Sequence, residues 1–388
     1  MKSYKIAICA IGYNRVDCLA RLLNSVEKAE YAQDVDLIIS IDKSNTTCVR
    51  EFSEEFEWTH GKKIVIAHPE NLGLKNHIIK CGNYLEEYNL DAIVVLEDDI
   101  TVSPYYLYYV VSCMEKYEYD DRIAGISLYN FQIDYVSRMP FNPMQSEFDI
   151  YMMNCAMSWG QVWMRKKWAA FYEWYQKNNE DFNLSYLPEK LNQWRKSWLR
   201  YHTRYCIEKN LYFIFPYISL STNNGEAGTH SKRDKTYVQS NLLCLPKKKW
   251  TLPTVDECVV KYDGFFAPKF LTDYLNVPAE QLVVDFTGVK KGKILKKYLL
   301  TCEELPYKIV NSFALKQKPI ESNIIMNVSG MGIYLYDTEK PDSTPHRVEE
   351  NLKLEYYFKN IFEFLTTNKG IMLILKLKAK KLINKIKK

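Results

Sequence analysis

The chain has 388 residues, of which 47% are hydrophobic and 26% are charged, a composition that fits one large globular domain and a smaller region. The net charge is +5, but residues 369–388 hold eight lysines and no acidic residue, and without them the net charge is −3. The body of the chain therefore lacks the basic surface of a nucleic-acid-binding protein.

Apolar segments that alternate with helical patterns fill the first half of the chain. Strands are predicted at 5–11, 36–42, 63–68, 92–96 and 122–129, with leucines at helical spacing between several of them. Aromatic helices are expected within 155–174 and 194–206, followed by a strand at 212–220. Strands that alternate with helices indicate an α/β fold, a mostly parallel sheet with helices on both faces.

Three carboxylates, Glu97, Asp98 and Asp99, directly follow the predicted strand at 92–96. Burying an unpaired carboxylate is costly, so this cluster indicates a bound cation or ligand. If the chain stays extended, Glu97 and Asp99 face one way and Asp98 faces the other. Pro104 then predicts the first position of a helix. Taken alone, the acidic triplet also fits a solvated strand end before a helix cap.

Other polar residues also follow predicted strands: Asn14 and Arg15 the first, Asp42 the second, and Asn71 and Lys75 the third. Ligands of such sheets bind outside the carboxyl ends of the strands, so jointly these side chains would line one cleft. Two cations beside a metal site suit a diphosphate, and carboxylates suit ribose hydroxyls. Taken singly, the two cations also fit solvated helix starts, and the aspartate fits a turn.

Two later residues are further candidates. Trp159 stands in an aromatic run, where such side chains are usually core but can also form a flat platform for a sugar ring. His230 lies in the loop 223–231 with two glycines, which fits either a presented imidazole or a structural histidine. Prolines at 246 and 253 predict that the main domain ends near residue 245 and that 246–366 form an accessory region.

The C-terminal segment 367–388 has apolar residues on one side of a helical wheel and most lysines elsewhere. This pattern predicts a basic amphipathic helix on an anionic membrane surface, although a frayed, solvated terminus is the alternative. Scattered cysteines, the absence of a signal-peptide layout and of an apolar stretch of about 20 residues predict a cytoplasmic protein, peripheral on the inner face of the plasma membrane.

Three segments, IAICAIGYNRVDCLARLLNSV, IVVLEDDITVSPYYLYY and AGTHS, make the first 245 residues resemble the GT-A glycosyltransferases. They are similar to bacterial family 2 type sugar transferases of surface polysaccharide synthesis and, more distantly, to the N-acetylglucosaminyltransferase I family. The resemblance implies that Asp99 is a direct ligand of Mn2+ or Mg2+, that Glu97 acts on the metal through water, and that Asp98 meets ribose or sugar hydroxyls.

The same resemblance implies roles for residues outside the acidic triplet. Arg15 and Asp42 would hold the nucleotide, and Lys75 would lie near the diphosphate. Trp159 and Gly160 of the SWG motif would line the sugar site. The loop AGTHS would bring His230 to the metal or the diphosphate.

The sequence departs from this family at the catalytic base. In the eukaryotic relatives a carboxylate precedes a helical tryptophan, whereas Arg195, Lys196 and Ser197 precede Trp198 here. The preceding segment offers alternatives, of which Asp181 is preferred. Glu180 and Glu189 are the other two candidates.

We therefore expect a metal-dependent inverting glycosyltransferase that moves a sugar from a nucleoside-diphosphate sugar, with UDP as the expected nucleotide. The expected acceptor is a glycan or a lipid-linked oligosaccharide. A metal-dependent nucleotidyltransferase is an alternative, although GYNRVD has one glycine and one arginine where such enzymes carry a glycine-rich basic loop. The second alternative is an inactive peripheral membrane scaffold that uses the basic tail.

Overall fold

The computed structural model describes residues 3–226, 236–290, 296–344 and 352–386. The chain forms two compact units, the first comprising Met1–Leu271 with Val289–Ile294 and the second Thr272–Gly288 with Leu295–Lys388. The first unit extends past residue 245 because β11 (Lys261–Tyr262) pairs with a strand of its sheet.

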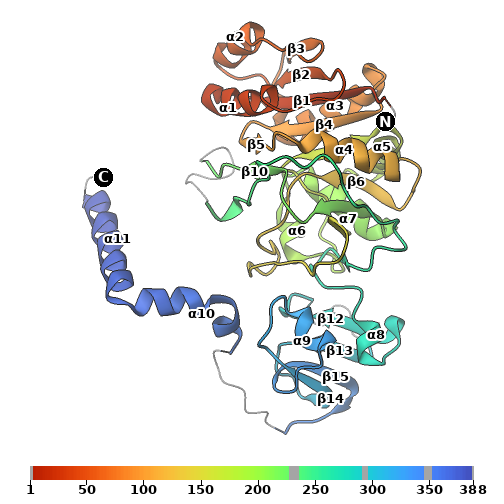
Figure 1. Ribbon diagram of the computed structural model, residues 1–388, viewed down its shortest axis with the longest axis vertical. Coiled ribbons are helices and arrows are strands. Elements are labelled where there is room, and N and C mark those ends of the chain that lie inside the picture. Colours follow the sequence, from red (N-terminus) through yellow and green to blue (C-terminus); the bar gives the residue numbers. More distant parts are fainter. Residues whose placement is uncertain (1–2, 227–235, 291–295, 345–351, 387–388) are drawn as a thin grey trace. The chain divides into compact units, whose positions relative to one another are not determined.

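The first unit opens with strands and helices in strict alternation (Figure 1). Strands β1, β2 and β4 are almost entirely buried and apolar, which is what strands covered on both faces require. They pair in parallel with one another in the order β4, β1, β2, β3. The elements are β1 (Ile6–Gly12), α1 (Val16–Glu27), β2 (Asp36–Ile41), α2 (Cys48–Glu55), β3 (Lys63–Ala67), α3 (Gly73–Glu87) and β4 (Ala92–Glu97).

The remainder of the first unit completes a sheet of nine strands among the described residues, in the order β11-β7-β9-β6-β8-β4-β1-β2-β3. Strand β8 runs antiparallel between β4 and β6, so its first residue lies at their carboxyl ends. The elements are β5 (Ile100–Val102), α4 (Tyr106–Tyr117), β6 (Ile123–Ser127), β7 (Ile150–Met153), β8 (Gln161–Met164), α5 (Arg165–Asn178), α6 (Glu189–Gln193), α7 (Leu199–Lys209), β9 (Tyr212–Pro216), β10 (Ser221–Asn223) and a 3-10 turn (Thr236–Val238).

Helices cover both faces of this sheet. Helices α1 and α4 pack on one face through residues such as Leu22 and Val110, in one buried cluster. Helices α3, α5 and α7 pack on the other through a cluster that includes Ile78, Phe171 and Tyr201. The predicted α/β architecture, a mostly parallel sheet with helices on both faces, is confirmed.

Local differences from the prediction fall at the short elements. Helix α4 begins at Tyr106 rather than at Pro104, because the chain first forms the strand β5 and a turn in which Ser103 Oγ accepts a hydrogen bond from Tyr105 N. The aromatic run predicted as helix from residue 155 begins instead with a loop and β8, and the helix starts at Arg165.

The second unit contains a four-stranded sheet in the order β12-β13-β15-β14. Helix α10 is held to it by an ion pair between Lys353 and Glu303 and by a hydrogen bond from the Tyr356 hydroxyl to Gln317 O. The elements are α8 (Thr272–Leu275), a 3-10 turn (Ala279–Gln281), β12 (Leu282–Asp285), β13 (Tyr298–Thr301), β14 (Tyr307–Ala314), α9 (Glu321–Ile325), β15 (Gly332–Pro341), α10 (Leu352–Thr366) and α11 (Asn368–Ile386).

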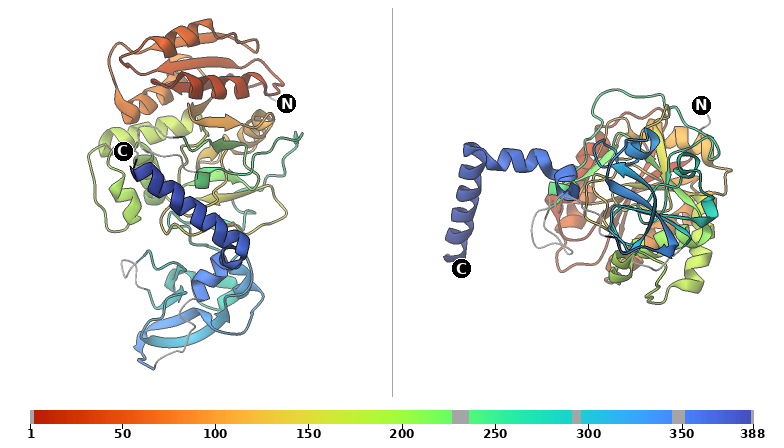
Figure 2. Two further views of the ribbon diagram at one scale, coloured as in Figure 1. Left: turned by 90° about the vertical axis from the view of Figure 1, so that its left-hand side faces the viewer. Right: turned by 90° about the horizontal axis from the view of Figure 1, so that it is seen from below.

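The chain bends between α10 and α11 (Figure 2). A side chain at Gly370 would meet the backbone of Phe364 and Leu365, so the bend requires glycine there. Beyond the bend, Ile371, Met372 and Leu375 are exposed. No helix in the described part of the chain is long and apolar enough to cross a membrane.

Candidate active site

The acidic triplet forms the turn that joins β4 to β5. Strand β4 ends at Glu97, which lies beside Ile11 near the end of β1, and the chain turns at Asp98 and Asp99. It does not stay extended through the triplet, because β5 pairs antiparallel with β10 directly afterwards. The turn therefore lies at the carboxyl edge of the parallel strands, where α/β sheets bind their ligands.

Among the residues that the structure describes, Arg15 is the cation that reaches this turn. It precedes the first residue of α1, and its Nε donates to Asp98 Oδ2 at 3.0 Å while its Nη2 pairs with Asp98 Oδ1. The same Nη2 lies 3.6 Å from Asp99 Oδ2. The residues that follow β1 and β4 thus meet, as expected for two neighbouring parallel strands.

Burial decides the electrostatics of the turn. It raises the pKa of Asp98 to about 6, although the hydrogen bond and charge of Arg15 act in the opposite direction. Burial, and then the charges of Asp99 and Asp98, raise the pKa of Glu97 well above its usual range. Asp99 Oδ1 is buried and has no hydrogen-bond partner within the described residues. One arginine thus compensates only part of the negative charge gathered here.

The other predicted strand-end residues form a separate group around the start of α3. Asp42 is buried, and its carboxylate accepts hydrogen bonds from Leu72 N at 2.8 Å and Gly73 N at 3.0 Å. Asn71 Nδ2 donates to Lys43 O, which fixes the same connection. Asp42 therefore holds the start of α3 in place.

Two further nucleotide-binding candidates, Lys75 and Asn14, have different surroundings. The ammonium group of Lys75 lies over the ring of Tyr201, 5.4 Å from its centre. Asn14 is exposed in the loop between β1 and α1.

Trp159 and Gly160 lead into β8 at the same edge of the sheet. The Trp159 ring is half-buried and meets the Tyr129 ring edge-on at 4.9 Å between centres. Gly160 has φ +91°, and a Cβ there would lie 2.8 Å from Ser221 Oγ. The glycine is therefore required both by its backbone conformation and by the close approach of the segment that begins β10.

The three candidates for the catalytic base lie in and beside the loop between α5 and α6. Asp181 Oδ1 accepts from Nη1 of the fully buried Arg200 at 2.5 Å, and Asp181 Oδ2 lies 3.7 Å from Arg195 Nε. The hydrogen bond from Arg200 lowers the pKa of Asp181. Glu180 and Glu189 are exposed. The structure thus gives Asp181 a structural partner.

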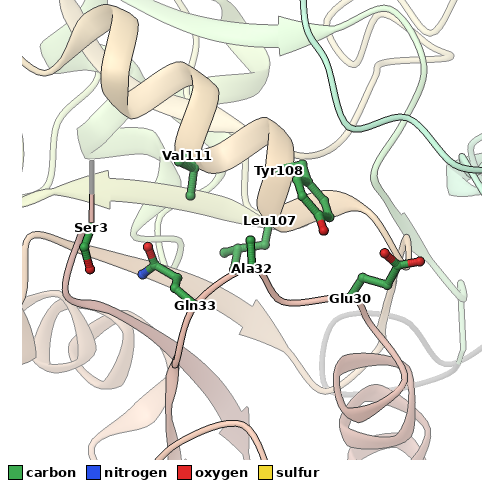
Figure 3. A pocket seen from close by; sticks show the side chains of 7 residues that line it. All are labelled: Ser3, Glu30, Ala32, Gln33, Leu107, Tyr108 and Val111. Atoms are coloured by element: carbon green, nitrogen blue, oxygen red, sulfur yellow. The ribbon is translucent and has the colours of Figure 1, made fainter. Parts of the chain in front are cut away.

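His230 lies outside the described residues. Within the described part of the chain, no group of three or more His, Cys, Asp or Glu side chains is placed to hold a metal ion. A cavity of about 220 Å³ lies elsewhere, between the segment around Glu30 and α4, and is lined by residues such as Gln33 and Tyr108 (Figure 3). None of the predicted site residues lines it.

Comparison with known families identifies the first unit. The sequence profile of the family described as "Glycosyl transferase family 2" matches residues 7–170, from β1 into α5. The match covers less than half of the chain, and this segment is similar to the family 2 glycosyltransferases. With the sheet described above, the match confirms the GT-A fold and the glycosyltransferase class that the sequence predicts.

Solved structures and curated proteins add little to this glycosyltransferase assignment. TarS 1–349 of S. aureus in complex with UDP is 13% identical, with a TM-score of 0.37, over 56% of this chain and 59% of that chain. The mannosyltransferase PcManGT from Pyrobaculum calidifontis, in complex with GDP-Man and Mn2+, is 10% identical, with a TM-score of 0.35, over 55% of each chain. The chain thus spans less than two thirds of the length of either protein. Among curated proteins, none matches.

The structure adds residues to this glycosyltransferase site that were not predicted from the sequence. Glu226, just after β10, pairs with Arg21 of α1 and accepts from Cys18 Sγ at 3.0 Å. The helical spacing of Cys18 and Arg21 could have placed both beside Arg15 on α1. The link to Glu226 joins residues 205 positions apart, and no local pattern indicates it.

Asn224 is the second unpredicted residue, and it holds the acidic turn from the side of β10. Its backbone N and its Nδ2 both donate to Asp99 O, at 2.8 and 3.0 Å, and Nδ2 also donates to Thr101 Oγ1 at 3.1 Å. These contacts fix the backbone on which the Asp99 carboxylate stands. Residues that bind a metal ion are typically held in place by hydrogen bonds from neighbouring residues in this way.

We expect Asn224→Ala to weaken Mn2+ binding in the presence of nucleotide by about 10- to 100-fold, the range usual for residues that orient a metal ligand. Titration with Mn2+, monitored by electron paramagnetic resonance, measures this change in Mn2+ affinity. Thr101→Val removes the neighbouring hydroxyl without touching Asp99 O and serves as the matched control. Equal losses in the two variants would contradict a specific role for the contact with Asp99.

Proposed function

We propose that the chain is a metal-dependent inverting glycosyltransferase that transfers a sugar from a nucleoside-diphosphate sugar to a glycan or lipid-linked acceptor. One observation supports this most directly. In a segment similar to the family 2 glycosyltransferases, Arg15 and the carboxylates of Asp98 and Asp99 meet at the carboxyl edge of β1 and β4, and one buried oxygen of Asp99 has no partner among the described residues. A diphosphate suits the arginine, and a divalent cation suits the free oxygen.

The donor atoms at this edge fit Mn2+ or Mg2+. Such hard cations in nucleotide sites are held by one or two carboxylates together with phosphate oxygens and water, so a larger cluster of protein ligands is not required. Asp99 would hold the ion, and His230 is the further ligand proposed from outside the described residues. When bound, the ion supplies positive charge to the diphosphate as it leaves the sugar.

The protein's own residues would bind and orient the donor. Arg15 and Lys75 provide positive charge for the diphosphate, and such charge counts most where negative charge develops in the transition state. Asp98 would accept hydrogen bonds from ribose or sugar hydroxyls, and Glu97 would act on the metal ion through a water molecule. Trp159, half-buried at the start of β8, offers a ring face to the sugar.

The acceptor hydroxyl must lose a proton to a carboxylate, a contribution of about 10²- to 10⁴-fold to the rate. We propose that this base comes from Glu180, Asp181 and Glu189, as the sequence suggested. Arg200 lowers the pKa of Asp181 and pairs with its carboxylate, which supports Glu180 or Glu189 as the base instead.

Asp181→Asn tests this preference. We expect a lower melting temperature, because the buried Arg200 loses its counter-ion, with kcat retained to within about tenfold at temperatures where the variant is folded. Glu180→Gln and Glu189→Gln are the comparison variants, and one of them should lower kcat by about 10²-fold or more. A loss of that size confined to Asp181→Asn would restore Asp181 as the base.

Incubation of the full chain with UDP-GlcNAc, GDP-mannose and other nucleotide sugars, with and without Mn2+, tests the proposed function. Metal-dependent release of sugar and nucleoside diphosphate is the expected result. Release of pyrophosphate from a nucleoside triphosphate and a sugar phosphate would indicate a nucleotidyltransferase instead. If neither reaction occurs and the chain binds neither UDP nor GDP, the result would indicate a scaffold without catalytic function.

We also propose that α11 binds the anionic inner face of the plasma membrane, where a lipid-linked acceptor is found. Its described part leaves Ile371, Met372 and Leu375 exposed beside Lys369 and Lys376, and apolar side chains with lysines suit an anionic interface. Removal of residues 369–388 should abolish flotation with phosphatidylglycerol vesicles and leave donor hydrolysis unchanged. Full flotation of the truncated chain would contradict this role.

A further inference from the structure

Arg15 serves as the counter-ion of two carboxylates of the acidic turn, those of Asp98 and Asp99. Its Nε and Nη2 both face the Asp98 carboxylate, in the two-point geometry that makes arginine–carboxylate pairs strong, and Nη2 also lies 3.6 Å from Asp99. The pair is largely shielded from water, since the side chain of Arg15 is 25% exposed and that of Asp98 is 10% exposed. Arg15 thus stands beside the carboxylate proposed to hold the metal ion.

This arrangement conflicts with the two roles proposed for the same residues. The face of the guanidinium group that holds Asp98 cannot hold a diphosphate at the same time. A cation that binds Asp99 would also meet the positive charge of Arg15 within a few ångströms, in a poorly solvated place where repulsion is strong. A diphosphate that takes the Nε and Nη2 donors and a cation that binds Asp99 therefore both compete with the present pairing of Arg15.

We propose that Arg15 is an exchangeable internal counter-ion, which closes the acidic turn without ligand and moves to the diphosphate when nucleotide binds, freeing Asp99 for the divalent cation. This inference rests on the proposed function and adds to it a coupling between the two ligands. Arg15 precedes α1 at a non-helical position without a side-chain cap hydrogen bond. The exchange would move the side chain of Arg15 and leave the helix α1 that follows it in place.

The exchange predicts that nucleotide and metal bind cooperatively. A cation that binds alone must break the pair between Arg15 and Asp98, and the arginine then lacks an anionic partner in a poorly solvated site. A diphosphate supplies that partner, so each ligand removes the cost that the other would meet. Linkage requires that the nucleotide tightens metal binding by the same factor as the metal tightens nucleotide binding.

Mn2+ affinity of the full chain, measured by electron paramagnetic resonance of the free ion with and without UDP or GDP, tests the exchange. For the wild-type chain we expect nucleotide to tighten Mn2+ binding on the order of tenfold or more. Arg15→Met should bind Mn2+ alone on the order of tenfold more tightly than the wild type, because the competing cation is gone. Nucleotide should then tighten Mn2+ binding by a smaller factor in the variant than in the wild type, because the phosphate oxygens still contact the ion but the release of Arg15 no longer contributes.

Two further variants separate the exchange from a general effect of charge. Arg204→Met removes another half-buried arginine, which pairs with Glu208 on α7, and should leave Mn2+ binding and coupling as in the wild type. Arg15→Lys keeps the charge but lacks the two-point geometry, so it should bind Mn2+ with intermediate affinity and reduced coupling. It also provides the test if Arg15→Met does not fold.

The outcomes are distinguishable. In one outcome, Arg15→Met binds Mn2+ more tightly than the wild type, by the same factor with and without nucleotide. This result would show that Arg15 stays at the carboxylates when nucleotide binds, and it would overturn the exchange alone. Unchanged Mn2+ affinity and coupling in that variant would overturn it as well. A wild-type chain that binds neither Mn2+ nor any nucleotide would overturn the proposed function itself.

Discussion

Replacement of Asp99 by asparagine is expected to lower the rate of sugar transfer by about 10³-fold while the protein stays folded. A bound metal ion contributes several kcal/mol to the stabilisation of a leaving diphosphate, and each 1.4 kcal/mol or so corresponds to about tenfold in rate. Asparagine keeps the shape of the side chain but removes the charge that holds the ion. The backbone beneath it is unaffected, because Asn224 binds the carbonyl oxygen of Asp99 rather than its side chain.

Stability should respond in the opposite direction to activity in this variant. Glu97, Asp98 and Asp99 place three acidic groups in one turn with Arg15 as the partner of two of them, so loss of one charge relieves repulsion. We therefore expect a melting temperature equal to or above that of the wild type. Loss of function without loss of stability is typical of a residue that is kept for binding or catalysis.

Initial rates of Mn2+-dependent transfer, calorimetric titration of UDP and a thermal melt measure these effects together. Asp256→Asn is the control for removal of a paired aspartate, since Asp256 pairs with Arg122 and its side chain is 81% exposed. It should keep the wild-type rate. Unchanged metal-dependent nucleotide binding in Asp99→Asn would exclude Asp99 as the metal ligand.

The buried strands could be predicted because their burial leaves a local signal. A strand covered on both faces reads as an unbroken apolar run, as in Ala92–Glu97, and the polar residues that follow it must lie at the edge of the sheet. The position of the acidic triplet next to Arg15 follows from this reasoning alone. The pairing of Arg15 with Asp98, 83 residues away, depends on side-chain geometry that no sequence pattern specifies.

The short elements could not be predicted for a physical reason. Strands β5, β8 and β10 have three or four residues each, too few to show a period, and they form through hydrogen bonds to distant strands. Strand β8 is also continuous with an aromatic helix, so its residues matched a helical pattern. The Asn224 contact with Asp99 was missed for the same reason, because it exists only once β10 pairs with β5.

The pairing of β8 also settles the role of one aromatic residue that follows the SWG motif. Trp163 faces the core beneath α3, α5 and α7, where its ring stacks on Trp168 at 4.2 Å and meets Trp198 edge-on at 5.5 Å. Gly82 of α3 makes room for this stack, since a Cβ there would lie 2.0 Å from the Trp168 ring. Because these side chains are so closely packed, the surrounding residues have little freedom to fill the cavity that a lost ring would leave.

Trp163→Ala should therefore lower the free energy of unfolding by about 3–5 kcal/mol, the range for loss of a buried tryptophan. Urea denaturation measures it. Trp163→Phe is the matched control and should lose far less, because Trp163 Nε1 is buried without a hydrogen-bond partner in the described residues and phenylalanine removes that unpaired group.

Trp159→Ala, four residues earlier, should have the opposite profile. Trp159 is half-buried and its ring has one close aromatic neighbour among the described contacts, Tyr129, so its truncation should cost less stability than that of Trp163. If Trp159 supports the donor sugar, the variant should lose affinity for UDP-GlcNAc or GDP-mannose and keep its affinity for UDP or GDP. Parallel losses for nucleotide and nucleotide sugar would contradict a sugar platform, because the two ligands differ only in the group that the ring would contact.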